Sequence, residues 1–579
     1  MNKRLATGIA VVAAFALALT GCARADDAPT GTGGTGTEGG GAVEHHDASA
    51  NMINAVGYDE LGDGGTLRLY NNAFPANFNT AHSDGNEVNT VEIMNAVYPS
   101  LYTYTADGQV IPNDLYTERL DKVSDEPLAF EIELVEGLEW SDGTPIDFQS
   151  IKNNFDAMVN EEFQVASREG YDKVASVEQG DNAHTAVVTF QEGQIYADWI
   201  GLAGVMPDAL VESADAFNSG WVDGPTVTAG PYKIGTIDSA NKVVTLVPDE
   251  NFKGERTAKL DQISFQTIED PSAAATAFND GQLDVVDASN QAIYSVVLDK
   301  IGEGTDFELR TAAGPNWTHF TLNGAEGNIL EDQNLRQAFM LGVDRKSIFQ
   351  ALNGTMPYPD GMADDLLGNH MLVQNQAGYV DNAGDYGTAD VEAAKALIEE
   401  SGWTLNGEYY EKDGQQLEIR YVYNAGSQVN GTVAPIITEN MKAIGIKVNV
   451  EQVPPTDLFS QYVIPGDYDM TLFGWAGNPF VTSAVSIWRD GGEQNFSGVG
   501  SPELDALLDE LQAETDADAQ TELLNQIDEL VWEVAGNMPL YQSYDFIVAH
   551  NDLANYGAFG FQAVDWSMVG YVKDSPKLG

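Results

Sequence analysis

Apolar and polar residues alternate with the period of a β-strand at three places in the later half of the chain. The first strand is expected over residues 417–423, the second over 446–450 and the third over 468–473. Apolar residues recur at helical spacing over 437–444, and residues 456–463 favour a short helix. This β-α-β-α-β order predicts parallel strands with helices packed on the sheet.

A glycine-rich segment follows the third strand. We expect that strand to end at Phe473 and residues 474–479, Gly-Trp-Ala-Gly-Asn-Pro, to form a loop. Ligands of parallel α/β sheets bind beyond the carboxyl ends of the strands, which places this loop and the one at 424–428 on the ligand edge. Trp475 offers a flat stacking face between glycines that let a backbone approach closely. The alternative is a Trp that only fills the core.

Other segments show equally clear periods. Residues 66–70 and 128–135 alternate as strands, and an Asp-Gly-Thr-Pro turn at 142–145 precedes a helix. Late in the chain Ser501 caps a helix with a stripe of leucines, and a second apolar stripe occupies 524–534. We interpret both late helices as core packing.

The charge of the chain is extreme. Its 579 residues are too many for one core and predict two or three domains. The 27 Lys and Arg residues stand against 89 Asp and Glu residues, a net charge of −62. Such a surface repels nucleic acid and anionic membranes, so we expect neither as a partner. It either attracts cationic ligands or only keeps an exposed protein soluble in salt, and the even spread of the acids favours solubility.

The first 22 residues have the pattern of a secretory signal. Lys3 and Arg4 precede an apolar run over residues 5–19, which is too short for a transmembrane helix. The run ends in Leu-Thr-Gly-Cys22, which resembles the bacterial lipobox, and Cys22 is the only cysteine of the chain. We expect lipidation of Cys22 and a protein anchored on the extracellular face of a bacterial membrane. A chance cysteine in a plain signal peptide is the alternative.

Residues 23–58 are rich in Gly, Thr and Asp and are expected to form a flexible tether. The run at 31–36 matches Gly-x-Gly-x-x-Gly, but no strand precedes it and no helix follows, so it does not indicate dinucleotide binding. His45 and His46 have no further ligand at usable spacing, and we expect neither a metal nor a cofactor.

Motifs of common secreted hydrolases are absent from the sequence. It contains no Gly-x-Ser-x-Gly and no His-Glu-x-x-His, and single histidines stand at 82, 184, 319 and 550. With so many carboxylates, acidic pairs arise by chance and do not argue for a glycosidase. We therefore expect no enzyme, and a hydrolase is the weakest alternative.

Residues 110–155 resemble the signature of the extracellular solute-binding proteins of oligopeptide and dipeptide ABC importers, solute-binding protein family 5. Further matches follow in the family's order, and the resemblance covers roughly residues 65–560. They stand at 229–232, 251–254, 270–272, 278–284, 320–323, 335–338, 343–345, 393–403, 501–505 and 538–541.

The resemblance implies an α/β, two-lobed periplasmic-binding-protein-like fold with an extra inserted subdomain in the first lobe. The expected boundaries are 59–103, 222–313 and 536–579 for the first lobe, 104–221 for the inserted subdomain and 314–535 for the second lobe. It further implies a monomeric receptor that captures a solute, most simply an oligopeptide, by hinge closure and delivers it to an ABC permease and its ATPase.

By resemblance the ligand lies between the first strand and the Gly-Trp loop. The residues nominated on one lobe are Asn71, Asn72 and Phe74. Those on the other are His319, Thr321, Asn424, Ser427, Gly474, Trp475 and Asn478, and near the final crossing Tyr541 and Tyr544.

The sequence departs from the family in the Gly-Trp loop. Peptide-binding members typically carry there an Asp that pairs with the α-ammonium group, whereas residues 476–479 contain no acid. Either another acid takes its place or the ligand is not held by a free N-terminus. Sugars, opines and nickel complexes are further ligands of the family. A degenerate binding fold with an envelope-assembly or signalling role is the alternative function.

Overall fold

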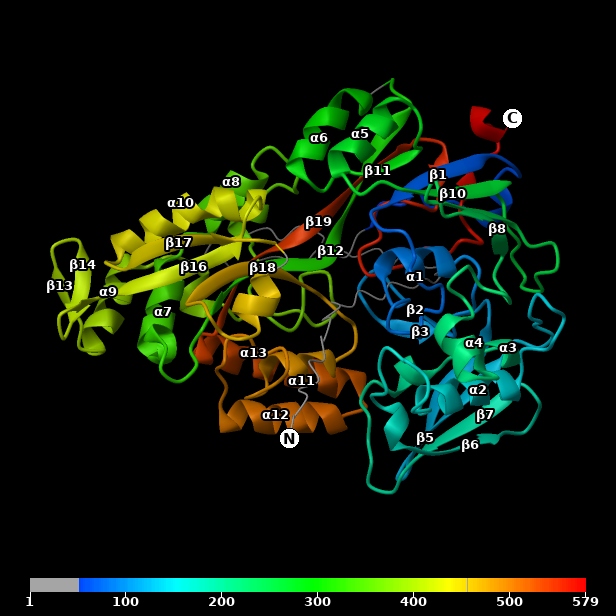
Figure 1. Ribbon diagram of the computed structural model, residues 1–579, viewed down its shortest axis with the longest axis horizontal. Coiled ribbons are helices and arrows are strands. Elements are labelled where there is room, and N and C mark those ends of the chain that lie inside the picture. Colours follow the sequence, from blue (N-terminus) through cyan, green and yellow to red (C-terminus); the bar gives the residue numbers. More distant parts are fainter. Residues whose placement is uncertain (1–50, 303, 456, 579) are drawn as a thin grey trace, which may run out of the picture.

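A computed structural model describes residues 51–302, 304–455 and 457–578. The expected signal peptide, with Cys22, and most of the expected tether lie outside the described residues. Figure 1 shows two bodies joined by the long strands β12 (Phe307–Leu322) and β19 (Asn537–His550), which run diagonally between them.

The first lobe is built on a four-stranded sheet of order β1-β10-β9-β8, in which β1 and β10 are parallel. Its buried residues, among them Leu67, Ile263 and Trp566, pack against helix α1 and the C-terminal segment. The bounds of its elements are β1 Thr66–Asn71, α1 Val88–Met94, β8 Tyr232–Asp238, β9 Val243–Pro248, β10 Gln262–Thr267, α5 Pro271–Asn279, α6 Gln291–Val297, β20 Leu553–Ala554 and β21 Gly570–Tyr571.

The inserted subdomain has its own antiparallel sheet, of order β4-β5-β7-β6, below the first lobe in Figure 1. Its core includes Phe130, Ile151 and Phe155, the last two from the helix expected after the Asp-Gly-Thr-Pro turn. The bounds here are β2 Tyr102–Tyr104, β3 Val110–Pro112, β4 Thr117–Asp125, β5 Leu128–Leu134, α2 Phe148–Met158, β6 Val174–Gln179, β7 Thr185–Phe190, η3 Trp199–Leu202, α3 Asp208–Val211 and α4 Ala214–Ser219.

A six-stranded sheet has the order β11-β19-β12-β18-β16-β17. The second lobe is built on the half of this sheet that ends in β18, β16 and β17. Helices α7 to α10 cover it, and α11 to α13 lie beneath it in Figure 1. The bounds are β11 Val285–Asp287, α7 Gln333–Gly342, α8 Arg345–Asn353, α9 Val391–Glu400, β13 Thr404–Asn406, β14 Tyr409–Lys412, β15 Gln415–Gln416, β16 Glu418–Asn424, α10 Gln428–Ala443, β17 Lys447–Val453, η8 Leu458–Val463, β18 Met470–Ala476, α11 Ser483–Trp488, α12 Pro502–Ala513 and α13 Ala517–Val534.

The predicted β-α-β-α-β unit is present. Strand β16 pairs in parallel with both β17 and β18. One part of the prediction is wrong, because β18 does not end at Phe473 but continues to Ala476. Its pairing with β12 keeps Gly474 and Trp475 extended, and a Cβ on Gly474 would stand 3.1 Å from the carbonyl oxygen of Trp317. The glycine here serves close strand packing and not a loop.

Residues 51–58, which we expected in the tether, are bonded to the C-terminal segment. Met52 forms a bridge with Ala558, and Asn54 Nδ2 donates to the carbonyl oxygens of Asn551 and Leu553 at 3.1 and 3.0 Å. Short polar residues of linker-like composition therefore serve here as hydrogen-bonding groups. The lobe boundaries stay predictions, and β12 runs through the expected one at 313–314.

Candidate functional site

A cavity of about 460 Å³ lies between the inserted subdomain and the second lobe. It is lined from the first side by residues of 107–110 and 197–200. From the other side it is lined by Trp317 and by residues of 370–377, 475–488 and 515–524. These segments are hundreds of residues apart in the chain, and the cavity exists only where the two bodies meet.

Four tryptophans contribute to the wall of the cavity. Trp317 on β12 and Trp475 on β18 stand opposite each other in the antiparallel register. Trp488 ends α11, and Trp199 begins η3 of the inserted subdomain. Large flat side chains from both bodies therefore face the same space, as in sites that bind small organic molecules.

Trp475 is held in place by a row of aromatic rings. The rings of His319 and Phe496 lie parallel to its indole, each at a centroid distance of 5.9 Å. Phe473 meets it edge-on at 5.5 Å. This packing fixes the indole at the end of β18, where it borders the cavity.

His319 supports Trp475 from inside the protein and does not line the cavity. Its side chain is fully buried, and Nδ1 lies 3.2 Å from the Oγ1 of Thr321, which is itself 1% exposed. Burial lowers the pKa of His319 to about 3, because a charged imidazolium would lose its hydration. The ring is therefore neutral at physiological pH.

Residues 477–482 pass from the cavity wall onto the inserted subdomain. The Gly477 N–H donates to the carbonyl oxygen of Pro315 at 2.6 Å, and Asn478 Oδ1 accepts from the Phe480 N–H at 2.9 Å. The Phe480 ring meets Tyr102 and Tyr104 edge-on, each at 6.0 Å. The second lobe thus inserts an aromatic side chain into the body opposite.

Asp198 of the inserted subdomain completes this contact. Its carboxylate accepts from the backbone N–H groups of Val481 and Thr482, at 3.0 and 2.8 Å, and from the Thr482 hydroxyl. Burial raises the pKa of Asp198 to about 6, and the three hydrogen bonds offset this only in part. We call the contacts of Asp198 and Phe480 across the two bodies the clasp.

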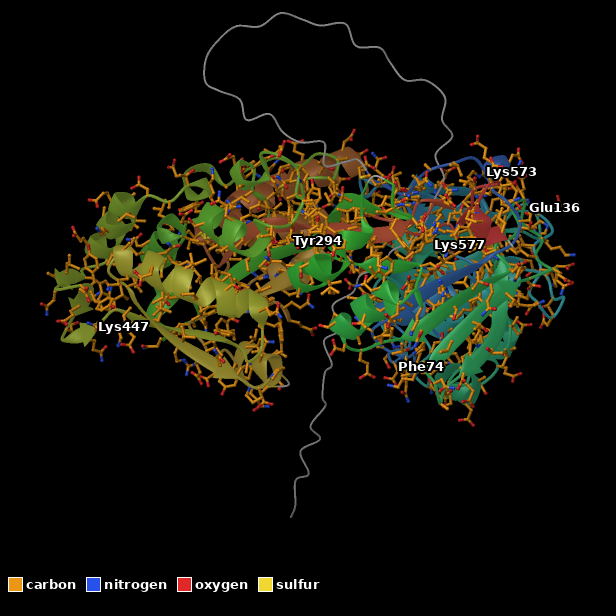
Figure 2. The ribbon with its side chains drawn as sticks, turned by 90° about the horizontal axis from the view of Figure 1, so that it is seen from above. Phe74, Glu136, Tyr294, Lys447, Lys573 and Lys577 are labelled. Atoms are coloured by element: carbon orange, nitrogen blue, oxygen red, sulfur yellow. The ribbon has the colours of Figure 1, made fainter. Side chains whose placement is uncertain are left out.

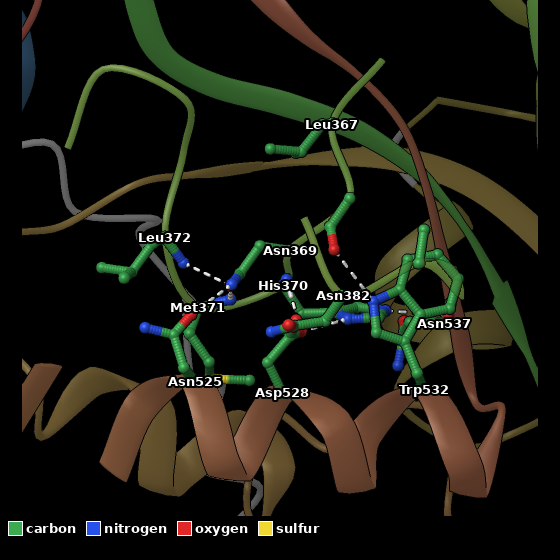
Figure 3. A network of polar contacts seen from close by, with 12 residues as sticks. Leu367, Asn369, His370, Met371, Leu372, Asn382, Asn525, Asp528, Trp532 and Asn537 are labelled. Carbon is green, nitrogen blue, oxygen red and sulfur yellow. Dashed lines mark hydrogen bonds and ion pairs between the residues drawn. The ribbon is translucent and has the colours of Figure 1, made fainter. Parts of the chain in front are cut away.

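A loop over residues 367–382 forms another part of the wall and is fixed by α13 (Figure 3). The fully buried Asp528 accepts from the backbone N–H and Nδ1 of His370, both at 2.7 Å, and from Nδ2 of Asn382 at 2.9 Å. Asn369 Oδ1 accepts from the N–H groups of Met371 and Leu372, each at 2.8 Å. Met371 and Leu372 then border the cavity.

Of the residues nominated from the sequence, Trp475 and Asn478 line this cavity and the others do not. Gly474 lies one residue before the lining, in β18. Tyr541 and Tyr544 are buried against rings of the second lobe, with Tyr541 5.5 Å from Phe349 and Tyr544 5.3 Å from Tyr358.

The nominated residues after β1 and β16 lie elsewhere. Asn72 exchanges hydrogen bonds with Asn89, and Phe74 packs on the first-lobe core, on the right-hand body of Figure 2. Ser427 caps α10, accepting from the Asn430 N–H at 3.2 Å, and Asn424 ends β16. Asn71 donates to the carbonyl oxygen of Asn89 at 3.2 Å.

Sequence reasoning missed the inserted-subdomain wall, the 367–382 loop and the start of α13. One signal existed, since Asp528 falls inside the apolar stripe of a helix that we interpreted as core alone. A buried acid in such a stripe needs a partner from elsewhere. Nothing local in 107–110 or 197–200 marks them, because only the fold brings them to the cavity.

The histidine and the serine that line the cavity are both engaged in hydrogen bonds within the protein. His370 is the histidine that lines it, and both ring nitrogens face oxygen acceptors, Asp528 at 2.7 Å and the carbonyl of Asn537 at 3.0 Å. The Ser483 hydroxyl donates to the carbonyl oxygen of Phe480 at 2.8 Å. The described residues hold no group of three His, Cys, Asp or Glu placed for a metal ion.

Comparison with known proteins agrees with the architecture. Residues 111–497 match the family model of the bacterial extracellular solute-binding proteins, family 5, middle region. The oligopeptide-binding protein OppA of Mycobacterium tuberculosis is 33% identical over 523 residues, which cover 89% of this chain and 86% of that protein.

Solved structures share the fold. The periplasmic EDTA-binding protein EppA has a TM-score of 0.79 at 22% identity and covers 92% of this chain and 100% of its own. The oligopeptide-binding protein AppA from Bacillus subtilis, in complex with a nonapeptide, has a TM-score of 0.67 at 18% identity, with coverage of 89% and 100%. The two-lobed fold expected from the sequence is confirmed.

Over the described ranges, no helix has both the length and the apolar character that crossing a bilayer requires.

The family expected from the order of motifs is also confirmed by the match over residues 111–497 and by the 33% identity to OppA. The chain belongs to family 5 of the bacterial extracellular solute-binding proteins.

Proposed function

We propose that this receptor captures a short peptide in the cavity between the inserted subdomain and the second lobe. The observation that carries the proposal is the cavity itself, about 460 Å³ with tryptophans on both sides. Its volume falls in the range of about 300–1,000 Å³ typical of small-molecule sites. A degenerate fold would fill this space with its own side chains. The relationship to an oligopeptide-binding protein at 33% identity supports a peptide as the ligand.

The edge of β18 offers a way to bind a peptide backbone. Strand β18 pairs with β16 at Met470 alone. After Met470, β12 is the one described strand that pairs with β18. Thr471 and Leu472 are buried, so residues 473–476 carry the backbone N–H and C=O groups that an extended peptide could pair with. Trp475 and Ala476, at the end of this edge, line the cavity.

The size of the cavity favours short ligands. An extended peptide advances about 3.3 Å per residue, so a nonapeptide spans roughly 30 Å. The cavity volume of about 460 Å³ lies in the lower part of the range of about 300–1,000 Å³ for small-molecule sites. We therefore expect peptides of about two to four residues.

The proposed mechanism is hinge closure. Contacts of the clasp and the hydrogen bond of Asn375 Nδ2 with the carbonyl oxygen of Ala106, at 3.3 Å, join the bodies around the cavity. Strands β12 and β19 cross between the bodies, and their register shifts between Ala313 and Trp317. Such an irregularity is a natural place for a hinge, and only the closed form would present the solute to the permease.

We further propose that the protein is a monomeric, non-catalytic partner of an ABC permease and its ATPase, held on the membrane by lipidation of Cys22. The lipobox-like ending of the apolar N-terminal run supports the anchor. Metabolic labelling with a palmitate analogue tests it, since label should be lost in Cys22→Ser.

Isothermal calorimetry with pools of di- to tetrapeptides tests the peptide assignment. We expect one-to-one binding in the micromolar range or tighter. Binding of sugars but of no peptide would contradict it.

A further inference from the structure

Among the residues that the structure describes, the cavity wall contains acids but no lysine or arginine. Asp107, Asp198 and Asp518 line it, and none of the described lining residues is a Lys or Arg. Lys122 touches the rim, where its ammonium donates to the Thr515 hydroxyl at 2.8 Å, but it also pairs with Asp125 at 2.8 Å. A negatively charged group of a solute would find no charge partner among these side chains.

Two of the three acids are available to a ligand. Asp198 is committed to the N–H groups and hydroxyl of the clasp. Asp107, half-buried in the turn between β2 and β3, accepts only from neutral groups, the Thr105 hydroxyl and Gln109 Nε2. Asp518 is exposed in the first turn of α13. Neither has an ion-pair partner among the described residues, so a ligand cation would meet uncompensated carboxylates from both bodies.

The tryptophans act in the same direction. The face of an indole carries negative charge density and attracts ammonium and guanidinium groups within about 6 Å. Trp199 stands on the side of Asp107, and Trp488 stands on the side of Asp518. The wall thus combines carboxylates with electron-rich ring faces, the two kinds of group that stabilise a bound organic cation.

The charge of the whole chain adds a long-range effect. A net charge of −62 raises the local concentration of cations near the protein and speeds their association, an effect that salt weakens.

Resting on the proposed receptor function, we propose that the cavity selects solutes that carry a protonated amine or a guanidinium group in addition to their backbone. The class is short basic peptides. Asp107 and Asp518 supply the charge partners, and acidic peptides are rejected.

Calorimetry of the full chain with Ala-Lys-Ala, Ala-Gln-Ala and Ala-Glu-Ala tests the selection. We expect the lysine peptide to bind about tenfold more tightly than the glutamine peptide, and the glutamate peptide to bind most weakly. Equal affinities for the three would overturn the charge selection and leave the receptor function standing. Spermidine is the further probe, because its binding without any peptide binding would support a cation site and overturn the peptide assignment.

Variants test which residues cause the preference for the lysine peptide. In Asp107→Asn with Asp518→Asn, the preference for the lysine peptide over the glutamine peptide should fall to about twofold. Asp121→Asn is the matched control, since Asp121 is exposed on β4 outside the cavity, and it should keep the full preference. A tenfold preference that survives in the double variant would overturn the role of these two acids. The comparison of peptides on the unaltered chain does not depend on how the variants fold.

Discussion

Trp475 is the residue on which the binding proposal depends most. Its indole borders the cavity and is packed between His319 and Phe496. We expect Trp475→Ala to weaken peptide binding by about thirtyfold or more, roughly 2 kcal/mol, because buried aromatic anchors dominate binding sites. Calorimetry measures the loss. Trp475→Phe, which keeps an aromatic ring, should lose less than tenfold, and an unaltered affinity in the alanine variant would show that the peptide binds elsewhere.

His319 makes the fold sensitive to acid. Its pKa is about 3 in the folded protein and about 6.5 in an unfolded chain, so the folded form binds fewer protons between these values. Its contribution to stability is complete above pH 6.5 and falls as the pH drops toward 3, by about 1.4 kcal/mol per pH unit. His319→Phe should keep the aromatic packing and flatten this part of the stability curve. Urea unfolding at pH 7, 6, 5 and 4 checks it, and parallel curves for both proteins would contradict the assignment.

The sequence marked Trp475 by its strand and by its small neighbours in the chain, and the resemblance to the family nominated Asn478. Both residues line the cavity. The sequence could not place His319 correctly. A histidine on a strand has the same sequence pattern whether its side chain faces a ligand or packs behind an indole. Only the packing of Phe473, Trp475 and Phe496 around the ring decides.

Among the elements, the clasp links closure to pH. The Asp198 carboxyl has a pKa of about 6 in the clasped form, against about 3.9 when exposed in an open form. The clasped form therefore binds more protons between these values and gains stability as the pH falls through 6, a gain that is complete below about pH 4. Fluorescence transfer between dyes on the two lobes, without ligand, should report more closed protein at pH 5 than at pH 7. Asp198→Asn should remove this dependence, and a pH response that persists in that variant would assign it to another group.

Helix α13 fixes the 367–382 loop through one buried carboxylate. In Asp528→Asn, one carboxylate oxygen is replaced by an N–H₂ group. That group then faces either the Asn382 amide donor or the two His370 donors, so at least one donor loses its acceptor. We expect a loss of about 2–4 kcal/mol in the free energy of unfolding. Glu529→Gln, an exposed neighbour on the same helix, should change it by less than about 0.5 kcal/mol. Denaturant unfolding measures the free energy of unfolding of both variants. Equal small losses would show that the hydrogen bonds of Asp528 are not needed for stability.

The elements themselves were largely predictable. Periods of two and near four residues located β16, α10, β17 and β18, and the length of the crossovers set the parallel pairing. The end of β18 was missed because its continuation depends on β12, a strand some 150 residues earlier in the chain.

At the scale of the whole molecule, the fold followed from the order of many weak motifs and not from any one of them. The cavity did not follow, because two of its walls belong to the inserted subdomain and to α13 and meet only in the assembled chain. The excess of acids was visible from the start, and we favoured solubility as its explanation. Because the described lining residues include acids but no lysine or arginine, we propose that part of that charge serves ligand choice.

Native mass spectrometry most directly tests whether this chain is a receptor that closes on a short peptide. The full chain is incubated with an equimolar mixture of di- to tetrapeptides of acidic, neutral and basic composition. We expect one-to-one complexes enriched in basic peptides, and we expect Trp475→Ala to lose these complexes. Bare protein alone, or the same complexes in the alanine variant, would contradict it.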